Sequence, residues 1–199
     1  MIVNSREEIL SAVRRNLPLY PKVQHPAIPF FKHPPLALRS AFVDHLLKAG
    51  GAAHDTRNSD EAASLITALH PGAKVVCSAV AEIAGTRRAE SVRVPHELAD
   101  VDVGVVRAQF GVAESGAVWL TQEDLVVDGL GFLSQHLVVL LDQEQIVADM
   151  QDAYRRVRLD LTAYGCFMMG PSATADIEAT LVHGAQGVRS LNVFFLPRS

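Results

Sequence analysis

Glu114 is the acidic residue of this 199-residue chain whose neighbours most suggest chemistry. If the surrounding run is a β-strand, Glu114 lies on the same face as Val112 and Val118. A carboxylate desolvated in this way would suit general acid–base catalysis, and one held as an anion could act as a nucleophile. Ser115 and Gly116 follow it, and the glycine leaves room for a ligand or another backbone. The alternative is that Glu114 lies at a strand end, in water or paired with an arginine.

The stretch Gly170–Glu178, with the sequence GPSATADIE, is the second candidate. It follows an apolar run, so we predict a strand, a Gly-Pro turn and a helix that begins near Thr174. In a parallel sheet the free amides of this turn would lie at the carboxyl edge, where ligands usually bind. The hydroxyls of Ser172 and Thr174 could hold a phosphate or a carboxylate. Alternatively, Thr174 only caps the helix, and Asp176 and Glu178 complement its dipole.

Three further stretches of the sequence are weaker candidates for ligand or metal binding. His136 precedes an apolar run and is either a site residue or a plain strand-end histidine. The stretch Gly184–Gly187 is predicted to be a turn, whose glycines serve backbone geometry or an anion nest. We expect Glu123–Gly131 to be a polar hairpin tip rather than a metal cluster. Cys77 and Cys166 form no CxxC pair and the eight histidines form no HxxxH pair, so we predict no metal site. No GxGxxG motif follows a predicted strand and no P-loop is present, so we predict no cofactor.

Composition narrows the classes of partner. The formal net charge is -4 and the pI is near 6.0, which argues against nucleic acid, because a nucleic-acid-binding protein needs a basic face. The charged cluster Arg155–Arg158 is predicted to be a solvated helix face. The start of the chain is charged and amphipathic, and no apolar run has the length of a membrane span. We therefore expect a cytoplasmic protein with no membrane partner.

Apolar periodicity predicts alternating strands and helices. The predicted helices are Leu38–Ala49, Ser59–Leu69, Val147–Leu161 and Ala175–His183. The predicted strands are Lys74–Cys77, Ser91–Val94, Val101–Val106, Phe110–Leu120, Leu137–Leu141, Gly165–Met169 and Leu191–Leu196. Such alternation indicates the α/β class, with a mainly parallel sheet flanked by helices.

The first 35 residues differ in pattern from the rest. A capping box at Ser5–Glu8 starts an amphipathic helix, and a proline-rich stretch without periodicity follows it. We therefore predict two parts, residues 1–35 as a helix with an extended arm and residues 36–199 as the α/β domain.

In these segments the chain resembles the LUD-domain family, in particular its lactate-utilisation protein C branch. The resemblance rests on three stretches and covers most of residues 36–197. They are Asp102–Val105, Val112–Ala117, and Gly170–Glu178 with Leu181–Gly184. The third stretch is the most specific. At the second, the family more often has AETGT where this chain has AESGA.

The resemblance implies a fold like that of the sugar-phosphate isomerase and coenzyme A transferase superfamily. It also implies a role in oxidising L-lactate to pyruvate beside partner subunits that carry iron–sulfur clusters. The motif residues carried over by position are Glu114, Ser115, Gly116, Gly170, Ser172, Thr174, Asp176 and Glu178. A glutamate in a similar strand setting is the nucleophile of coenzyme A transferases, which makes Glu114 the candidate catalytic residue by analogy of fold.

One departure from the family pattern bears on function. The family usually has Gly-x-His-Gly-Pro where this chain has Gly184-Ala185-Gln186-Gly187-Val188, so Gln186 replaces a histidine. Two hypotheses follow. In the first, the chain is a subunit of a lactate-oxidation complex. In the second, it is an enzyme or binding protein for a small anion, an acyl-coenzyme A or a sugar phosphate, which uses Glu114 and the Ser172–Thr174 turn.

Overall fold

The computed structural model describes residues 5–17, 29–30, 37–158, 160–175 and 181–198. It divides the chain into two units, residues 1–32 and residues 33–199. The first unit contains helix α1 (Ser5–Asn16), on which the apolar residues Ile9 and Val13 are exposed. The second unit contains all the other helices and strands that the structure describes.

A six-stranded sheet forms the centre of the second unit, with strand order β1-β12-β7-β4-β2-β3. Its members are β1 (Ala52–Asp55), β2 (Val76–Ser78), β3 (Arg87–Arg88), β4 (Val103–Arg107), β7 (His136–Leu141) and β12 (Ser190–Phe195). Every neighbouring pair is parallel. The predicted α/β class with a mainly parallel sheet is therefore confirmed.

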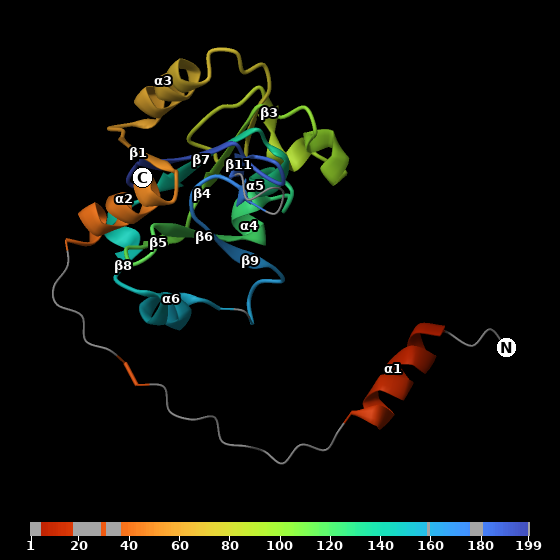
Figure 1. The fold of residues 1–199 in the computed structure, drawn as a ribbon. Helices are drawn as coiled ribbons and strands as arrows, with labels where there is room; N and C mark the ends of the chain where they lie inside the picture. The colour runs from red at the N-terminus through yellow and green to blue at the C-terminus, as the bar shows by residue number, and fades with distance from the viewer. Residues whose placement is uncertain (1–4, 18–28, 31–36, 159, 176–180, 199) are drawn as a thin grey trace. The chain divides into compact units, whose positions relative to one another are not determined.

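Both faces of this sheet are covered, which explains why its strands are continuous apolar runs. Helix α3 (Ser59–Leu69) lies on one face (Figure 1), where Ile66 packs in one cluster with Val138 and Phe194. Helix α2 (Leu38–Lys48) contributes Phe42 and Leu46 to the main core on the other face. Alternate residues of β4, β7 and β12 enter the two clusters, as the twofold period of a strand requires.

A second, four-stranded sheet has the order β8-β5-β6-β9. Its members are β5 (Phe110–Val112), β6 (Ala117–Thr121), β8 (Ile146–Val147) and β9 (Gly165–Met168). Helix α6 (Met150–Arg156) lies beyond it (Figure 1), and Ala153 packs in one cluster with Phe110 and Trp119.

Several sequence predictions were wrong in this region. The single strand Phe110–Leu120 is a hairpin of β5 and β6, with a turn over residues 113–116. The helix predicted over Val147–Leu161 begins only at Met150, because Val147 pairs in β8. The hairpin tip predicted at 123–131 consists of two short helices, α4 (Gln122–Leu125) and α5 (Leu130–Leu133).

The remaining elements are short. They are three 3₁₀ helices, η1 (Ala89–Ser91), η2 (Pro95–Leu98) and η3 (Gln143–Gln145), and two strands, β10 (Ala173–Thr174) and β11 (Val182–His183). The strand predicted at Ser91–Val94 is therefore wrong. No helix in the described ranges has the length and apolar character needed to cross a membrane.

Helix α2 is in unusually close contact with two turns. Gly116 has φ +70°, and a methyl group on it would lie 2.3 Å from the backbone nitrogen of Leu46. Gly170 has φ +64°, and a methyl group there would lie 2.1 Å from the backbone oxygen of Ala49. Since Ala49 follows Leu46 by three residues, the two turns lie against neighbouring positions at the end of one helix. Only glycine satisfies both the dihedral angle and the spacing.

We predict that Gly116→Ala lowers the free energy of unfolding by about 3 kcal/mol, because both the left-handed backbone and the α2 contact are strained. Urea denaturation followed by circular dichroism measures this change. Gly72→Ala is the matched control, since no heavy atom lies within 4 Å of the added methyl group. Equal stability of the two variants would contradict the close-contact interpretation.

Candidate functional site

Glu114 lies in the turn that joins β5 to β6, and its side chain is exposed. Its carboxylate oxygen Oε2 accepts a hydrogen bond of 2.9 Å from the backbone nitrogen of Met150, the first residue of α6. Its own backbone nitrogen donates to Ala148 O at 3.0 Å. The expected burial on a strand face is therefore wrong, and the alternative of an exposed strand-end position holds. Asp149 is the N-cap of α6 and accepts from Asp152 N, and Glu114 adds a second acceptor for a free amide at the same helix start.

The rest of this turn is fastened to α2. Ser115 Oγ accepts a hydrogen bond of 3.3 Å from the backbone nitrogen of Ala117. His45 Nδ1 lies 2.9 Å from Ala113 O and 3.0 Å from Ala41 O, so a proton on this nitrogen is shared by two carbonyl groups. Together with the contact at Gly116, these bonds explain why the turn has one fixed shape.

The Gly170–Pro171 turn was expected at the carboxyl edge of the parallel sheet, but it lies at the amino edge. It follows β9, which belongs to the four-stranded sheet and pairs antiparallel with β6. Ser172 N donates to Val188 O at 2.9 Å, and Gly184 N donates to Ser172 O at 2.8 Å. Val188 lies two residues before β12 begins, so the turn lies at the amino edge of the six-stranded sheet. The predicted position at the carboxyl edge is wrong.

The helix predicted to begin near Thr174 is also wrong within the described residues. Ala173 and Thr174 form β10, which pairs antiparallel with Val182 and His183 of β11. Asp176 and Glu178, predicted to complement a helix dipole or bind a ligand, lie outside the described residues. Backbone pairing between two segments replaces the local cap that the sequence pattern favoured.

A cavity of about 330 Å³ brings together Gly170, Ser172 and Gln186, with Phe132 and Phe167 on its apolar side. Of the motif residues, it therefore contains those of the Gly170 turn and the position where the family has a histidine. Glu114, Ser115, Gly116 and Thr174 are not among the residues that line it. The two candidate segments thus share contact with α2 without sharing this cavity.

The chemistry available in this cavity is hydrogen bonding. Ser172 offers a hydroxyl group and Gln186 an amide, and no charged side chain is among the described residues that line it. A histidine at position 186 would supply a group that exchanges a proton near neutral pH, whereas glutamine supplies only a donor and an acceptor. The described residues that line the cavity therefore offer hydrogen bonds to a bound molecule.

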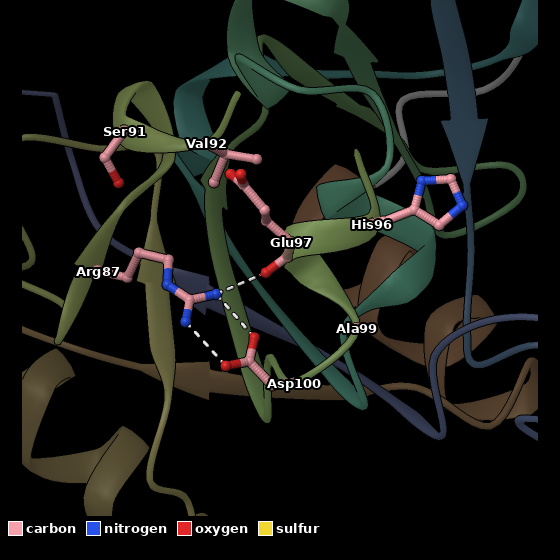
Figure 2. A pocket seen from close by; sticks show the side chains of 7 residues that line it. All are labelled: Arg87, Ser91, Val92, His96, Glu97, Ala99 and Asp100. Carbon is pink, nitrogen blue, oxygen red and sulfur yellow. Dashed lines mark hydrogen bonds and ion pairs between the residues drawn. The ribbon is translucent and has the colours of Figure 1, made fainter. Parts of the chain in front are cut away.

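A second hollow, of about 440 Å³, surrounds an ion pair (Figure 2). Arg87 donates to both carboxylate oxygens of Asp100, at 2.7 and 2.8 Å, and to the backbone oxygen of Glu97 at 2.7 Å. Hydrogen bonding with Arg87 lowers the pKa of the Asp100 carboxyl. His96 points away from this pair (Figure 2). Since the guanidinium is already matched by a carboxylate, the pair joins β3 to the segment before β4 and leaves little charge for a ligand.

Neither cysteine has the surroundings of a nucleophile. Burial is the main cause that raises the pKa of the Cys77 and Cys166 thiols, so little thiolate forms near neutral pH. In the part of the chain that the structure describes, no group of three or more histidine, cysteine, aspartate or glutamate residues could hold a metal ion.

A third hollow lies at the amino edge of the six-stranded sheet. The sequence pattern indicates His136 as a candidate there, but it does not indicate the neighbouring residues His70 and Ser190. The rings of His70 and His136 are stacked with centroids 4.3 Å apart, and Ser190 Oγ lies 2.8 Å from His136 Nδ1. The available signal was the polar pair Ser190 and Asn192, spaced by two in an otherwise apolar strand.

Comparisons with known proteins identify the family to which the chain belongs. A family model described as LUD domain matches residues 83–196. Lactate utilization protein C of Shouchella clausii is 35% identical over 92 residues, which cover 43% of this chain and 40% of that protein. The protein of the same name from Halalkalibacterium halodurans is 28% identical over 104 residues, which cover 49% of this chain and 45% of that protein. The chain thus spans less than half the length of these curated relatives.

A solved structure is similar over a larger part of the chain. The crystal structure of a DUF162 family protein from Deinococcus radiodurans matches with a TM-score of 0.62. The match covers 81% of this chain and 99% of that one, at 18% sequence identity. At this level of identity the likeness shows a shared fold.

We predict that Glu114→Ala lowers the free energy of unfolding by about 1 kcal/mol, because Met150 N at the start of α6 loses its acceptor. Glu114→Gln keeps an acceptor oxygen and should lose less than half of that amount. Glu144→Ala, at another exposed glutamate, is the control and should leave thermal unfolding unchanged. A Glu114→Ala variant as stable as the control would show that the capping contact contributes nothing.

Proposed function

Because the chain belongs to the LUD domain family, we propose that it is a subunit like lactate utilization protein C that takes part in oxidising L-lactate to pyruvate. The observation that carries the proposal is the family match over residues 83–196, together with the name shared by the curated relatives. Under this proposal the protein acts in the cytoplasm beside iron–sulfur partner subunits.

The cysteine content supports such a division of work between subunits. Oxidation of lactate to pyruvate releases two electrons, and an iron–sulfur cluster that accepts them is usually held by four cysteines. This chain has only Cys77 and Cys166, which lie in β2 and β9, strands of different sheets. Under the proposal the partner subunits therefore supply the clusters, and this chain supplies binding surface. We further propose that residues 1–35 form a segment separate from the domain at 36–199.

A second candidate function is binding or conversion of a small anion, an acyl-coenzyme A or a sugar phosphate on a fold of the coenzyme A transferase type. The observation that favours it is the cavity lined by Gly170 and Ser172. In this candidate Glu114 is the catalytic residue, Ser115 and Gly116 lie beside it, and Thr174 helps to hold the anion. Glu114 Oε2 already accepts from Met150 N, so in this candidate the other carboxylate oxygen, Oε1, contacts the substrate.

We predict that deletion of the gene abolishes or strongly slows growth on L-lactate as the sole carbon source, while growth on pyruvate is unchanged. The pyruvate culture is the control, because the proposed step lies between the two compounds. Restoring the gene on a plasmid should restore growth. Full growth of the deletion strain on L-lactate would contradict the proposed role.

The second candidate makes a different prediction. In the complemented strain, Glu114→Gln should abolish growth on L-lactate if Glu114 is a nucleophile, because an amide cannot replace it. Growth at the normal rate would remove the catalytic assignment and leave the subunit role intact.

A further inference from the structure

A line of polar side chains crosses the face of the six-stranded sheet that α3 covers. On β12, Asn192 is buried and Ser190 is half-buried, and both lie on the same face as Phe194, which packs under α3. His136 stands opposite Ser190 in the register of β7. His54 Nε2 lies 3.1 Å from Asn192 Oδ1. Asn192 Nδ2 lies 3.3 Å from Ser190 Oγ, and Ser190 Oγ lies 2.8 Å from His136 Nδ1. The four side chains form one continuous hydrogen-bond network across the strands β1, β12 and β7.

These bonds allow the tautomer of His136 that carries its proton on Nε2. An amide nitrogen only donates, so Asn192 Nδ2 donates to Ser190 Oγ. The single hydroxyl proton of Ser190 is then free to donate to His136 Nδ1. A neutral imidazole that accepts at Nδ1 carries its proton on Nε2. In this tautomer, the hydrogen-bond network ends in an N–H donor on His136 that no other member of the network uses.

His70, the residue that ends α3, fixes the ring of His136 in place. Burial is the main cause that lowers the pKa of both imidazoles, so both rings are neutral near neutral pH and can stack without repulsion. His70 Nε2 is buried and has no hydrogen-bond partner among the described residues. A buried polar nitrogen without a partner is rare and costly, and this one lies beside a cavity.

The cavity has a volume of about 560 Å³ and lies at the amino ends of β7 and β12. His70, His136 and Arg189 line it, as does the amide of Gln135. The Arg189 side chain is exposed and makes no ion pair with any residue in the described ranges. Asp102 also lines the cavity, but its Oδ2 already accepts from the backbone nitrogens of Lys74 and Val75.

We propose that this cavity, formed by His70, His136 and Arg189, binds a small oxyanion. The donors it offers are the guanidinium of Arg189, the side-chain amide N–H of Gln135 and, in the tautomer described above, the Nε2–H of His136. An arginine fork beside a further N–H donor matches the oxygens of a carboxylate or a phosphate group. Within the described chain, no group of three or more histidine, cysteine, aspartate or glutamate residues could hold a metal ion.

The site differs from the cavity at Gly170 and Ser172, and it does not depend on the role proposed in lactate oxidation. Arg189 and Ser190 line the one cavity, while Gln186, Gly187 and Val188 line the other. The segment ahead of β12 therefore contributes to both. Val188, the residue before Arg189, accepts a hydrogen bond from Ser172 N. A ligand bound at Arg189 would therefore lie close to the Gly170–Pro171 turn.

Isothermal titration calorimetry of the full 199-residue protein tests the proposal, with pyruvate and inorganic phosphate as separate probes. We expect at least one of them to bind at one site per chain, and the comparison tells a carboxylate from a phosphate ligand. Arg189→Gln should weaken binding by about tenfold or more, because a charge-assisted contact is lost. Arg93→Gln, at an exposed arginine outside this cavity, is the charge-matched control and should bind like the wild type.

His136→Phe tests the donor separately, because phenylalanine can keep the stacking with His70 while it removes Nε2–H. It should weaken binding, with thermal unfolding serving to confirm that the variant is folded. A nitrogen-15 spectrum of the wild type gives a readout that needs no variant, and it should show His136 protonated on Nε2. Failure of the wild type to bind either probe, or undiminished binding by Arg189→Gln, would overturn the proposal.

The affinity should also depend on pH. The charged groups that line the cavity are Arg189 and Asp102, and the titrating groups are His70 and His136. The pKa of His136 is lowered by burial and by Arg189, so the ring gains its positive charge only on acidification. Binding should therefore tighten as the pH falls through that pKa. Equal affinity on both sides of it would show that the anion does not contact His136.

Discussion

The close packing of two glycine turns against helix α2 is the constraint on which the rest of the structure depends. Gly116 lies against the backbone of Leu46, and Gly170 lies against that of Ala49. One turn joins β5 to β6, and the other follows β9, so a single helix holds the four-stranded sheet at two points. This packing places the Gly170 turn at the amino edge of the parallel sheet, next to the segment that leads into β12.

The parallel sheet was predictable from sequence because its strands are buried on both faces and read as plain apolar runs. The hairpin of β5 and β6 was not, because the pattern of Phe110–Leu120 suits one long strand equally well. What decides between them is the contact of Gly116 with α2, which is distant in sequence. The same holds for Val182 and His183, which pair with β10 although the local pattern around them favours a helix.

The candidate site was only partly visible in the sequence for a similar reason. The motif residues Gly170 and Ser172 do line a cavity, but Glu114 is occupied as a cap for α6. The chain of hydrogen bonds that ends at His136 is built from residues of three strands, and no local spacing reveals it. A buried polar side chain such as Asn192 needs hydrogen-bond partners, and His54 and Ser190 supply them, so the hydrogen-bond network extends from β1 to the cavity.

Ligand binding is therefore expected at the amino ends of β7 and β12, whereas open parallel sheets usually bind ligands at their carboxyl ends. The most direct test is a map of backbone amide chemical shifts during titration with pyruvate or phosphate. We expect the largest changes in amide chemical shift at residues 135–137 and 188–192. Changes concentrated instead at the carboxyl ends of β4 and β7, around Arg107 and Leu141, would contradict it.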